Sequence, residues 1–223
     1  MLAALLTLAL ATATPPVVCV DPGHGGRPNP ATEPIGPGSA TRKAKDGGGA
    51  SGVTTGQREA ELALDVSLRL RTLLAREGIR VVMTHTTASG PSLGNVVRAR
   101  TCNRARASLM LRVHADGSPS RAVHGTHTLH PAFRRGWTDD IAVPSLRAAR
   151  LVQRALVARL GSRDLGLQER GDLTGFNWAD VPVVLVELGF LSNPREDRLL
   201  ATPGYRARAA AGLRDGTLAF LGR

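Results

Sequence analysis

The sequence predicts an α/β fold, in the form of a single-domain three-layer sandwich: a largely parallel, mixed twisted sheet with helices on both faces. Three observations lead to this prediction. Short apolar runs alternate along the chain with longer segments that carry apolar residues at helical spacing. The 223 residues suffice for one domain with a full hydrophobic core. No internal repeat is visible along the chain.

The first half of the chain opens with an apolar strand and a long loop. Residues 16–20 are almost continuously apolar, and residues 25–57 are rich in Gly, Pro, Ser and Thr. A loop of that length in a compact domain is usually functional or mobile. A helix is expected over residues 59–76, where apolar residues recur at helical spacing: Leu62, Val66, Leu70 and Leu73. Gly78 ends that helix, and residues 79–83 form the next strand.

The second half continues the alternation. Helices are expected over residues 96–107, 144–160 and 205–221, and strands over residues 109–113, 123–129 and 183–186. Pro144 suits the first turn of its helix, and Gly161 is typical of a residue that ends one. Ligand sites in such folds lie beyond the carboxyl ends of the strands. Polar residues at strand ends are therefore the first candidates for a site.

The chain is strongly basic, with a net charge of +11, and its only lysines are Lys43 and Lys45. An excess of positive charge favours polyanionic partners, either nucleic acid or acidic cell-wall polymers. The sequence shows no aromatic-basic motif and no helix-turn-helix pattern, so we expect no nucleic-acid partner. The alternative is that the arginines are merely solvated on helix faces.

The N-terminal segment, residues 1–13 (MLAALLTLALATA), is apolar, uncharged and ends in small residues, which predicts a secretory signal peptide. It is too short to span a bilayer, so we expect no stable membrane insertion. It lacks the usual basic start, and the alternative is an apolar helix that stays in the mature chain. Cleavage would leave residues 14–223 as one exported domain, in the periplasm, the cell wall or outside the cell.

The two cysteines, Cys19 and Cys102, do not have the spacing of a CxxC metal site. If the protein is exported, an oxidising compartment would allow a disulfide between them. The alternative is two buried free thiols, which are common in protein cores.

Four polar residues lie at the ends of apolar elements. His24 follows the first strand in TPPVVCVDPGH, His114 ends SLMLRVH, and Glu59 opens a helix. Two imidazoles and one carboxylate are the ligand set of a catalytic zinc with one coordination position open. Glu187 ends VPVVLVE at the same predicted sheet edge, where a carboxylate could transfer protons. The sequence therefore predicts a metallohydrolase.

Each of these residues also has a simpler interpretation. A histidine at a strand end is often structural, and Glu59 could merely favour the positive end of its helix. Glu187 could be a buried carboxylate paired with an arginine. The agreement of all four residues outweighs these individual alternatives.

Four motifs in order resemble those of the zinc-dependent N-acetylmuramoyl-L-alanine amidases, the amidase_3 type of cell-wall hydrolase. They are DPGHGG (residues 21–26), EAELALDVSLRLRTLLAREG, RARTCNRARASLMLRVHAD (residues 98–116) and VPVVLVELGFLSNP (residues 181–194). The match covers nearly the whole chain after the N-terminal segment. One motif alone would be weak, but four with compatible spacing are specific.

The resemblance implies that His24, Glu59 and His114 hold zinc and that Glu187 is the catalytic residue. Glu61 is the rival ligand, but only Glu59 brings the leucines of the helix into register with the family pattern. The implied reaction is hydrolysis of the amide between the lactyl group of N-acetylmuramic acid and L-alanine of the stem peptide. The implied partners are peptidoglycan or muropeptides, and the implied protein is a monomer. The alternative is a peptidoglycan-binding module without catalysis.

Several residues beside the motifs have more than one candidate role. Arg112 stands where the family usually has a small polar residue, and on a strand it shares a face with His114. It could reach a substrate carboxylate or support a ligand from behind. Asp21 could accept a hydrogen bond from a ligating imidazole, and Asn193 is expected to brace a loop. No long insertion interrupts residues 116–180, so we expect an open site.

The remaining histidines are not expected to bind the metal. On a strand, His124 and His130 would share a face, with His127 opposite. We interpret all three as surface or rim residues, with His127 nearest the substrate. His85 follows a strand and has no partner that the sequence identifies.

Overall fold

The computed structural model describes residues 14–223, so the predicted signal peptide lies outside the described residues. Its centre is a six-stranded sheet in the order β4-β1-β5-β8-β6-β7. The strands are β1 (Val17–Pro22), β4 (Arg80–Met83), β5 (Leu109–Asp116), β6 (Thr126–Pro131), β7 (Asp164–Arg170) and β8 (Val183–Phe190). Every neighbouring pair is parallel except β6 with β8. The predicted mixed, largely parallel sheet is confirmed.

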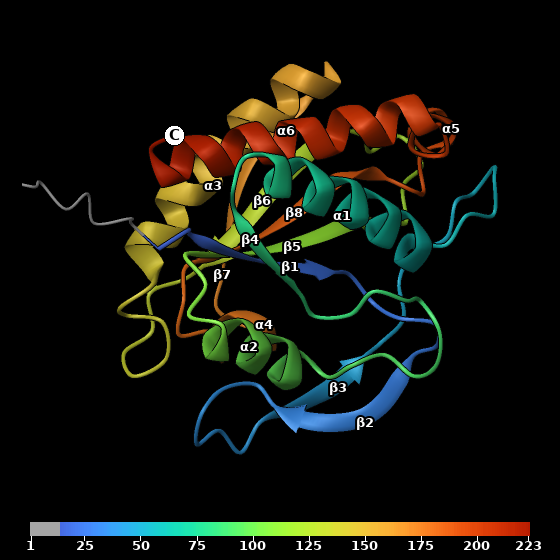
Figure 1. Cartoon of the computed structure of the whole chain (residues 1–223). Helices are drawn as coiled ribbons and strands as arrows, with labels where there is room; N and C mark the ends of the chain where they lie inside the picture. Colours follow the sequence, from blue (N-terminus) through green and yellow to red (C-terminus); the bar gives the residue numbers. More distant parts are fainter. Residues whose placement is uncertain (1–13) are drawn as a thin grey trace, which may run out of the picture.

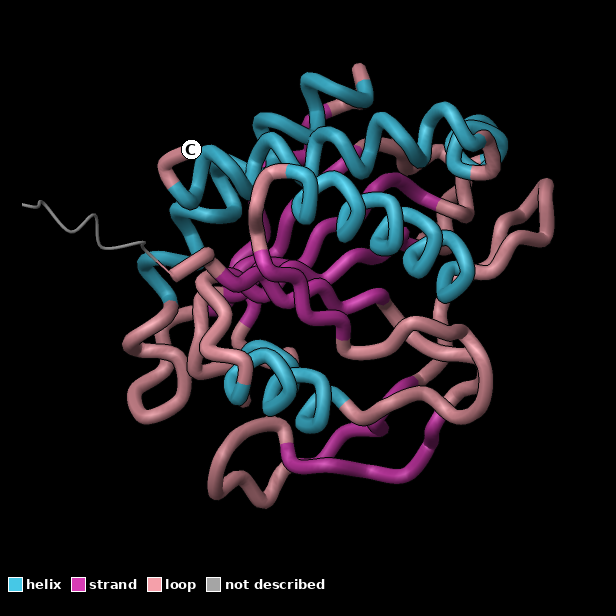
Figure 2. The backbone as a smooth tube through the Cα atoms, in the orientation of Figure 1, coloured by secondary structure: helices cyan, strands magenta, loops and turns pink. Residues whose placement is uncertain are grey.

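Helices cover both faces of this sheet (Figure 1). On one side lie α1 (Glu59–Arg76), α3 (Ala142–Leu160), α5 (Pro194–Leu200) and α6 (Pro203–Leu221). On the other side lie α2 (Asn95–Arg104) and the short α4 (Thr174–Asn177). The tube in Figure 2 shows the sheet between these two layers, which confirms the three-layer sandwich. No helix within residues 14–223 is long and apolar enough to cross a membrane.

Two apolar cores separate the layers, because alternate strand residues face opposite sides of the sheet. Val18 and Val20 of β1 pack in the core beneath α1, α3 and α6. Val17 and Cys19 of the same strand pack in the smaller core on the side of α2 and α4. Burial on both faces explains why these strands read as continuous apolar runs.

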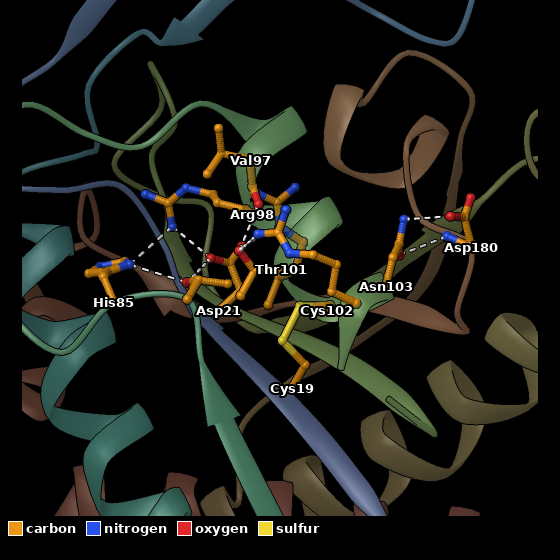
Figure 3. Close-up of a disulfide and its surroundings, with 12 residues drawn as sticks. Cys19, Asp21, His85, Val97, Arg98, Thr101, Cys102, Asn103 and Asp180 are labelled. Carbon is orange, nitrogen blue, oxygen red and sulfur yellow. Dashed lines mark hydrogen bonds and ion pairs between the residues drawn. A yellow bond between two sulfur atoms is a disulfide. The ribbon is translucent and has the colours of Figure 1, made fainter. Parts of the chain in front are cut away.

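A disulfide crosses the smaller core. Cys19 of β1 is bonded to Cys102 of α2, with their Cα atoms 5.4 Å apart (Figure 3). The disulfide considered from the sequence is therefore present, and free thiols are not. It fastens α2 to β1, the strand that leads into the turn of His24.

The expected loop over residues 25–57 was an incomplete prediction. It contains an antiparallel hairpin of β2 (Asn29–Pro34) and β3 (Arg42–Asp46), visible below α2 in Figure 1. The indole of Trp178 donates to the carbonyl of Pro34 at 2.9 Å, and that of Trp137 donates to Pro37 at 3.0 Å. The hairpin is polar and depends on such distant anchors, so no local apolar alternation announced it.

Three elements were not predicted from the sequence: β7, α4 and α5. β7 is an exposed edge strand of mostly polar residues, and edge strands commonly have weak apolar patterns. The short α5 begins with Pro194 and is capped by Asn193, whose side chain accepts from the backbone N–H groups of Arg195 and Glu196. The Asn193 amide also donates to the carbonyl of Arg121, so its expected bracing role is confirmed.

Candidate metal centre

Three of the four predicted site residues meet at the carboxyl edge of the sheet. One ligand atom each from His24, Glu59 and His114 lies within 4.8 Å of the others. Oε1 of Glu59 is 3.2 Å from Nε2 of His24 and 2.9 Å from Nδ1 of His114. The turn after β1, the first residue of α1 and the end of β5 supply these side chains.

The backbone turn that presents His24 is strained and held from behind. His24 has a φ of +59°, in the left-handed region that is costly for residues other than glycine. The guanidinium of Arg98 donates to the carbonyl oxygens of His24 and Pro22, which secures the turn. Gly23 must be a glycine, because a Cβ there would lie 2.6 Å from the ring of His114.

Asp46, at the end of β3, orients the His24 ring. Nδ1 of His24 donates to Oδ1 of Asp46 at 2.7 Å, which leaves Nε2 facing Glu59. Burial alone would lower the pKa of His24, but the carboxylates of Asp46 and Glu59 raise it to about 9. The ring therefore lies in a strongly negative field that favours a cation.

Glu59 is buried, and both of its carboxylate oxygens accept a backbone hydrogen bond. Its Oε2 accepts from the backbone N–H of Ala50 at 2.8 Å, and its Oε1 accepts from that of Ala115 at 3.2 Å. Burial would raise the pKa of Glu59, yet the two histidines hold it well below its usual range. The rival Glu61 is exposed and lies 3.4 Å from Arg58, away from the centre.

These donors fit a zinc ion. Two imidazole nitrogens and one carboxylate oxygen face a common point, as in zinc sites that keep a fourth position open. Burial lowers the pKa of His114, so that ring is neutral and can offer a lone pair. The Nδ1 of that ring is the nitrogen that faces Glu59, whereas its Nε2 is buried without a partner in the described part of the chain.

Glu187 lies beside this cluster. It is directly opposite His114 across the β5–β8 ladder, and its side chain is buried. Burial, with the nearby carboxylates of Glu59 and Asp116, raises the pKa of Glu187 well above its ordinary value. Its Oε2 has no hydrogen-bond partner among residues 14–223. A pocket of about 340 Å³ is lined by all four predicted site residues, in agreement with the expected open site.

The interpretation of the downstream histidines was partly wrong. His124 is exposed, as expected, but His127 and His130 are buried. They lie on β6, whose two faces are covered by α3 and α4. His127 pairs with Glu187 across the sheet, and its Nε2 is 3.5 Å from a carboxylate oxygen of Asp116.

Asp21 does not accept from an imidazole ligand, contrary to one expectation. Its carboxylate accepts from Arg98 at 2.7 Å, Arg112 at 2.8 Å and Thr84 at 2.6 Å (Figure 3 shows Asp21 with Arg98 and the neighbouring His85). Burial and the positive charge of the nearby Arg98 guanidinium lower the pKa of His85. The acceptor for a ligand ring is Asp46, which sequence reasoning missed.

Comparison with known proteins bears on this centre. The family described as N-acetylmuramoyl-L-alanine amidase (Amidase_3) matches residues 18–218. An N-acetylmuramoyl-L-alanine amidase of Mycobacterium tuberculosis is 32% identical, over 98% of this chain and 94% of that protein. The amidase LytC of Bacillus subtilis is 28% identical, and the match spans 35% of its length.

Solved structures are similar over the same region. The crystal structure of the N-acetylmuramyl-L-alanine amidase Ami1 from Mycobacterium smegmatis superposes with a TM-score of 0.84 at 28% identity, covering 93% of this chain and 97% of that one. The amidase from Clostridium difficile 630 superposes with a TM-score of 0.75 at 25% identity, covering 93% and 97%.

Proposed function

Because the chain belongs to the N-acetylmuramoyl-L-alanine amidase family, we propose that it is a zinc-dependent hydrolase of peptidoglycan stem peptides. The bond cleaved is the amide between the lactyl group of N-acetylmuramic acid and L-alanine. The observation that carries the proposal is a single pocket shared by His24, Glu59, His114 and Glu187. The first three would hold the metal, and the fourth would transfer protons.

Zinc bound by the three donors would supply a Lewis acid for the amide carbonyl and for the attacking water. The protein's own contribution centres on Glu187. Its carboxylate accepts a proton from the water that attacks the carbonyl carbon, and then passes that proton to the amide nitrogen as the C–N bond breaks. The products are a lactyl carboxylate and the free amine of L-alanine. A raised pKa suits Glu187 to both steps, because it must bind and release the same proton.

The second candidate is a peptidoglycan-binding module without catalysis. What favours catalysis is the unengaged Oε2 of Glu187 beside a complete set of donors. A buried carboxylate without a hydrogen bond is costly, so a module that only binds would have little reason to keep it.

We further propose that the protein is exported and acts as a monomer on the wall. The disulfide between Cys19 and Cys102 supports export, since such bonds persist in oxidising compartments. Relatives are named N-acetylmuramoyl-L-alanine amidases, and one of Bacillus anthracis is named a cell wall amidase, which supports a substrate outside the cytoplasm.

The test combines metal content with turnover on purified peptidoglycan. Wild-type protein should release stem peptides, and a chelator should stop the release. Glu187→Gln should lower turnover by about a hundredfold or more while leaving zinc bound. His24→Ala should lose the metal, whereas His124→Ala, at an exposed histidine, should keep both metal and activity. Binding to the wall without any release would support the second candidate, and metal loss from Glu187→Gln would mean that Glu187 is a ligand.

A further inference from the structure

A second pocket, of about 180 Å³, adjoins the metal centre on the side of α2 and the hairpin. We call it the Arg112 pocket. His24 and His114 form its wall toward the centre, and Lys45, Asn95, Arg98 and Arg112 form much of the rest. Whatever binds there would lie directly beside the scissile amide of a bound substrate.

The guanidinium of Arg112 is held by two hydrogen bonds, and one of its nitrogens has no acceptor in the described part of the chain. Its Nε donates to Asp21 at 2.8 Å, and its Nη2 donates to the side-chain oxygen of Asn95 at 2.6 Å. Its Nη1 donates no hydrogen bond within the described part of the chain. This nitrogen is also not fully buried. Gly175 of α4 leaves room for Nη1, since a Cβ at that residue would collide with it. The side chain, which is 5% exposed, is thus held in place with donors to spare.

Two cationic side chains of the pocket lining, Arg112 and Lys45, lack a full set of partners in the described part of the chain. Arg98 and Arg112 are both buried and share one carboxylate, that of Asp21. Lys45 adds a third cation to the lining, and it forms no ion pair with the described residues. The only carboxylate in the lining, Asp46, is already engaged by His24. Lys45 and Nη1 of Arg112 are therefore the cationic groups that remain for a ligand.

We propose that the Arg112 pocket binds a carboxylate of the stem peptide within one or two residues of the scissile amide. This inference rests on the proposed amidase function and names the substrate feature that the site selects. A partly desolvated guanidinium with free N–H donors binds a carboxylate through charge-assisted hydrogen bonds, which are stronger than neutral ones. Lys45 on the rim would add attraction, and Arg98 would hold Asp21 so that Arg112 stays in place.

The test uses two muramoyl peptides that differ only in that group, as a free carboxylate or as a primary amide. Wild-type enzyme should prefer the carboxylate in kcat/KM by about ten- to a hundredfold. Arg112→Gln and Lys45→Met should each move this ratio toward one. Lys43→Met is the matched control, because it removes the chain's other lysine, which pairs with Asp172 outside the pocket. The ratio compares two substrates on one enzyme, so it does not depend on how much of a variant folds.

A binding measurement separates the inference from turnover. Glu187→Gln should bind the carboxylate peptide more tightly than the amide in calorimetry, and the further change Lys45→Met should reduce that difference. Equal cleavage of both peptides by wild type, or an unchanged ratio in both pocket variants, would overturn the inference and leave the amidase proposal standing. If neither peptide were cleaved while purified peptidoglycan also remained intact, the amidase proposal itself would fail.

Discussion

Asp46 sets the orientation of the His24 ring in the candidate metal centre. It fixes the proton on Nδ1 and turns Nε2 toward the centre, while also accepting from the backbone N–H of Gly48. We predict that Asp46→Ala lowers zinc affinity by about 10- to 100-fold, because the ring loses both its orientation and its preferred tautomer. Competition with a chromophoric chelator measures the change.

Two controls show whether orientation is the cause. Asp46→Asn keeps an acceptor oxygen and should lose less affinity than the alanine variant. Asp172→Asn loosens the same hairpin through Lys43 but does not contact His24. If Asp172→Asn lowered zinc affinity as much as Asp46→Ala, the effect would belong to the hairpin as a whole.

Asp21 is the buried counter-charge of two arginines behind the candidate site. It is completely buried between two buried guanidinium groups, those of Arg98 and Arg112. We predict that Asp21→Asn lowers the free energy of unfolding by about 3–5 kcal/mol, because both arginines lose their buried counter-charge. Urea denaturation at neutral pH measures the loss.

The same residue predicts how acid affects stability. Burial would raise the pKa of Asp21, but Arg98, Arg112 and Thr84 hold it well below its ordinary value. A carboxylate with a depressed folded-state pKa stabilises the protein fully above its unfolded pKa, near 3.9, and loses that effect as pH falls further. The stability difference between wild type and Asp21→Asn should therefore be constant above about pH 5 and shrink below pH 4. A difference that stayed constant down to pH 2 would contradict this account.

At the residue scale, the sequence revealed the groups that end apolar elements and not those that support them. His24 follows β1, and His114 and Glu187 lie in the carboxyl halves of β5 and β8, so their meeting at one edge follows from parallel topology. Asp46 lies 22 residues beyond His24 in a polar hairpin, and no local pattern connects the two. His127 was misplaced because the antiparallel pairing of β6 with β8 cannot be read from its own residues.

At the element scale, the helices and strands that are well buried were the ones that the sequence predicted. Strands buried on both faces and helices with an apolar stripe were expected within a few residues of their observed bounds. The hairpin of β2 and β3 was not, because its stability comes from the tryptophan and lysine contacts made elsewhere in the chain. Edge strand β7 was missed for a related reason, since one of its edges carries no partner strand.

The disulfide is the element-scale feature whose removal is easiest to interpret. It closes a loop of 83 residues between β1 and α2, so its loss frees the unfolded chain considerably. We predict that reduction lowers the free energy of unfolding by about 2–5 kcal/mol. Thermal unfolding with and without reductant measures the shift. The double variant Cys19→Ala/Cys102→Ala should unfold at the same temperature in both conditions, and a reductant effect on that variant would point to another cause.

At the scale of the whole molecule, the candidate site residues and most of the positive charge lie in different places. The metal donors and Glu187 are concentrated at one edge of the sheet, whereas most arginines are distributed over the helices and loops. Residues 1–13 contain no charged side chain, so their removal would leave the net side-chain charge at +11. General attraction to an acidic wall would therefore not depend on the candidate site, and it can be measured without turnover.

We predict that wall binding falls steeply with salt. Attraction between exposed charges is screened over about 10 Å at 0.1 M ionic strength and over about 3 Å at 1 M. Glu187→Gln, which should bind without cutting, should be retained on purified wall at about 20 mM salt and mostly released near 500 mM. Sedimentation with the wall measures the bound fraction, and wall stripped of its acidic polymers is the control. Retention that is equal at both salt concentrations would show that specific contacts in the groove, and not the charge of the whole molecule, hold the protein on its substrate.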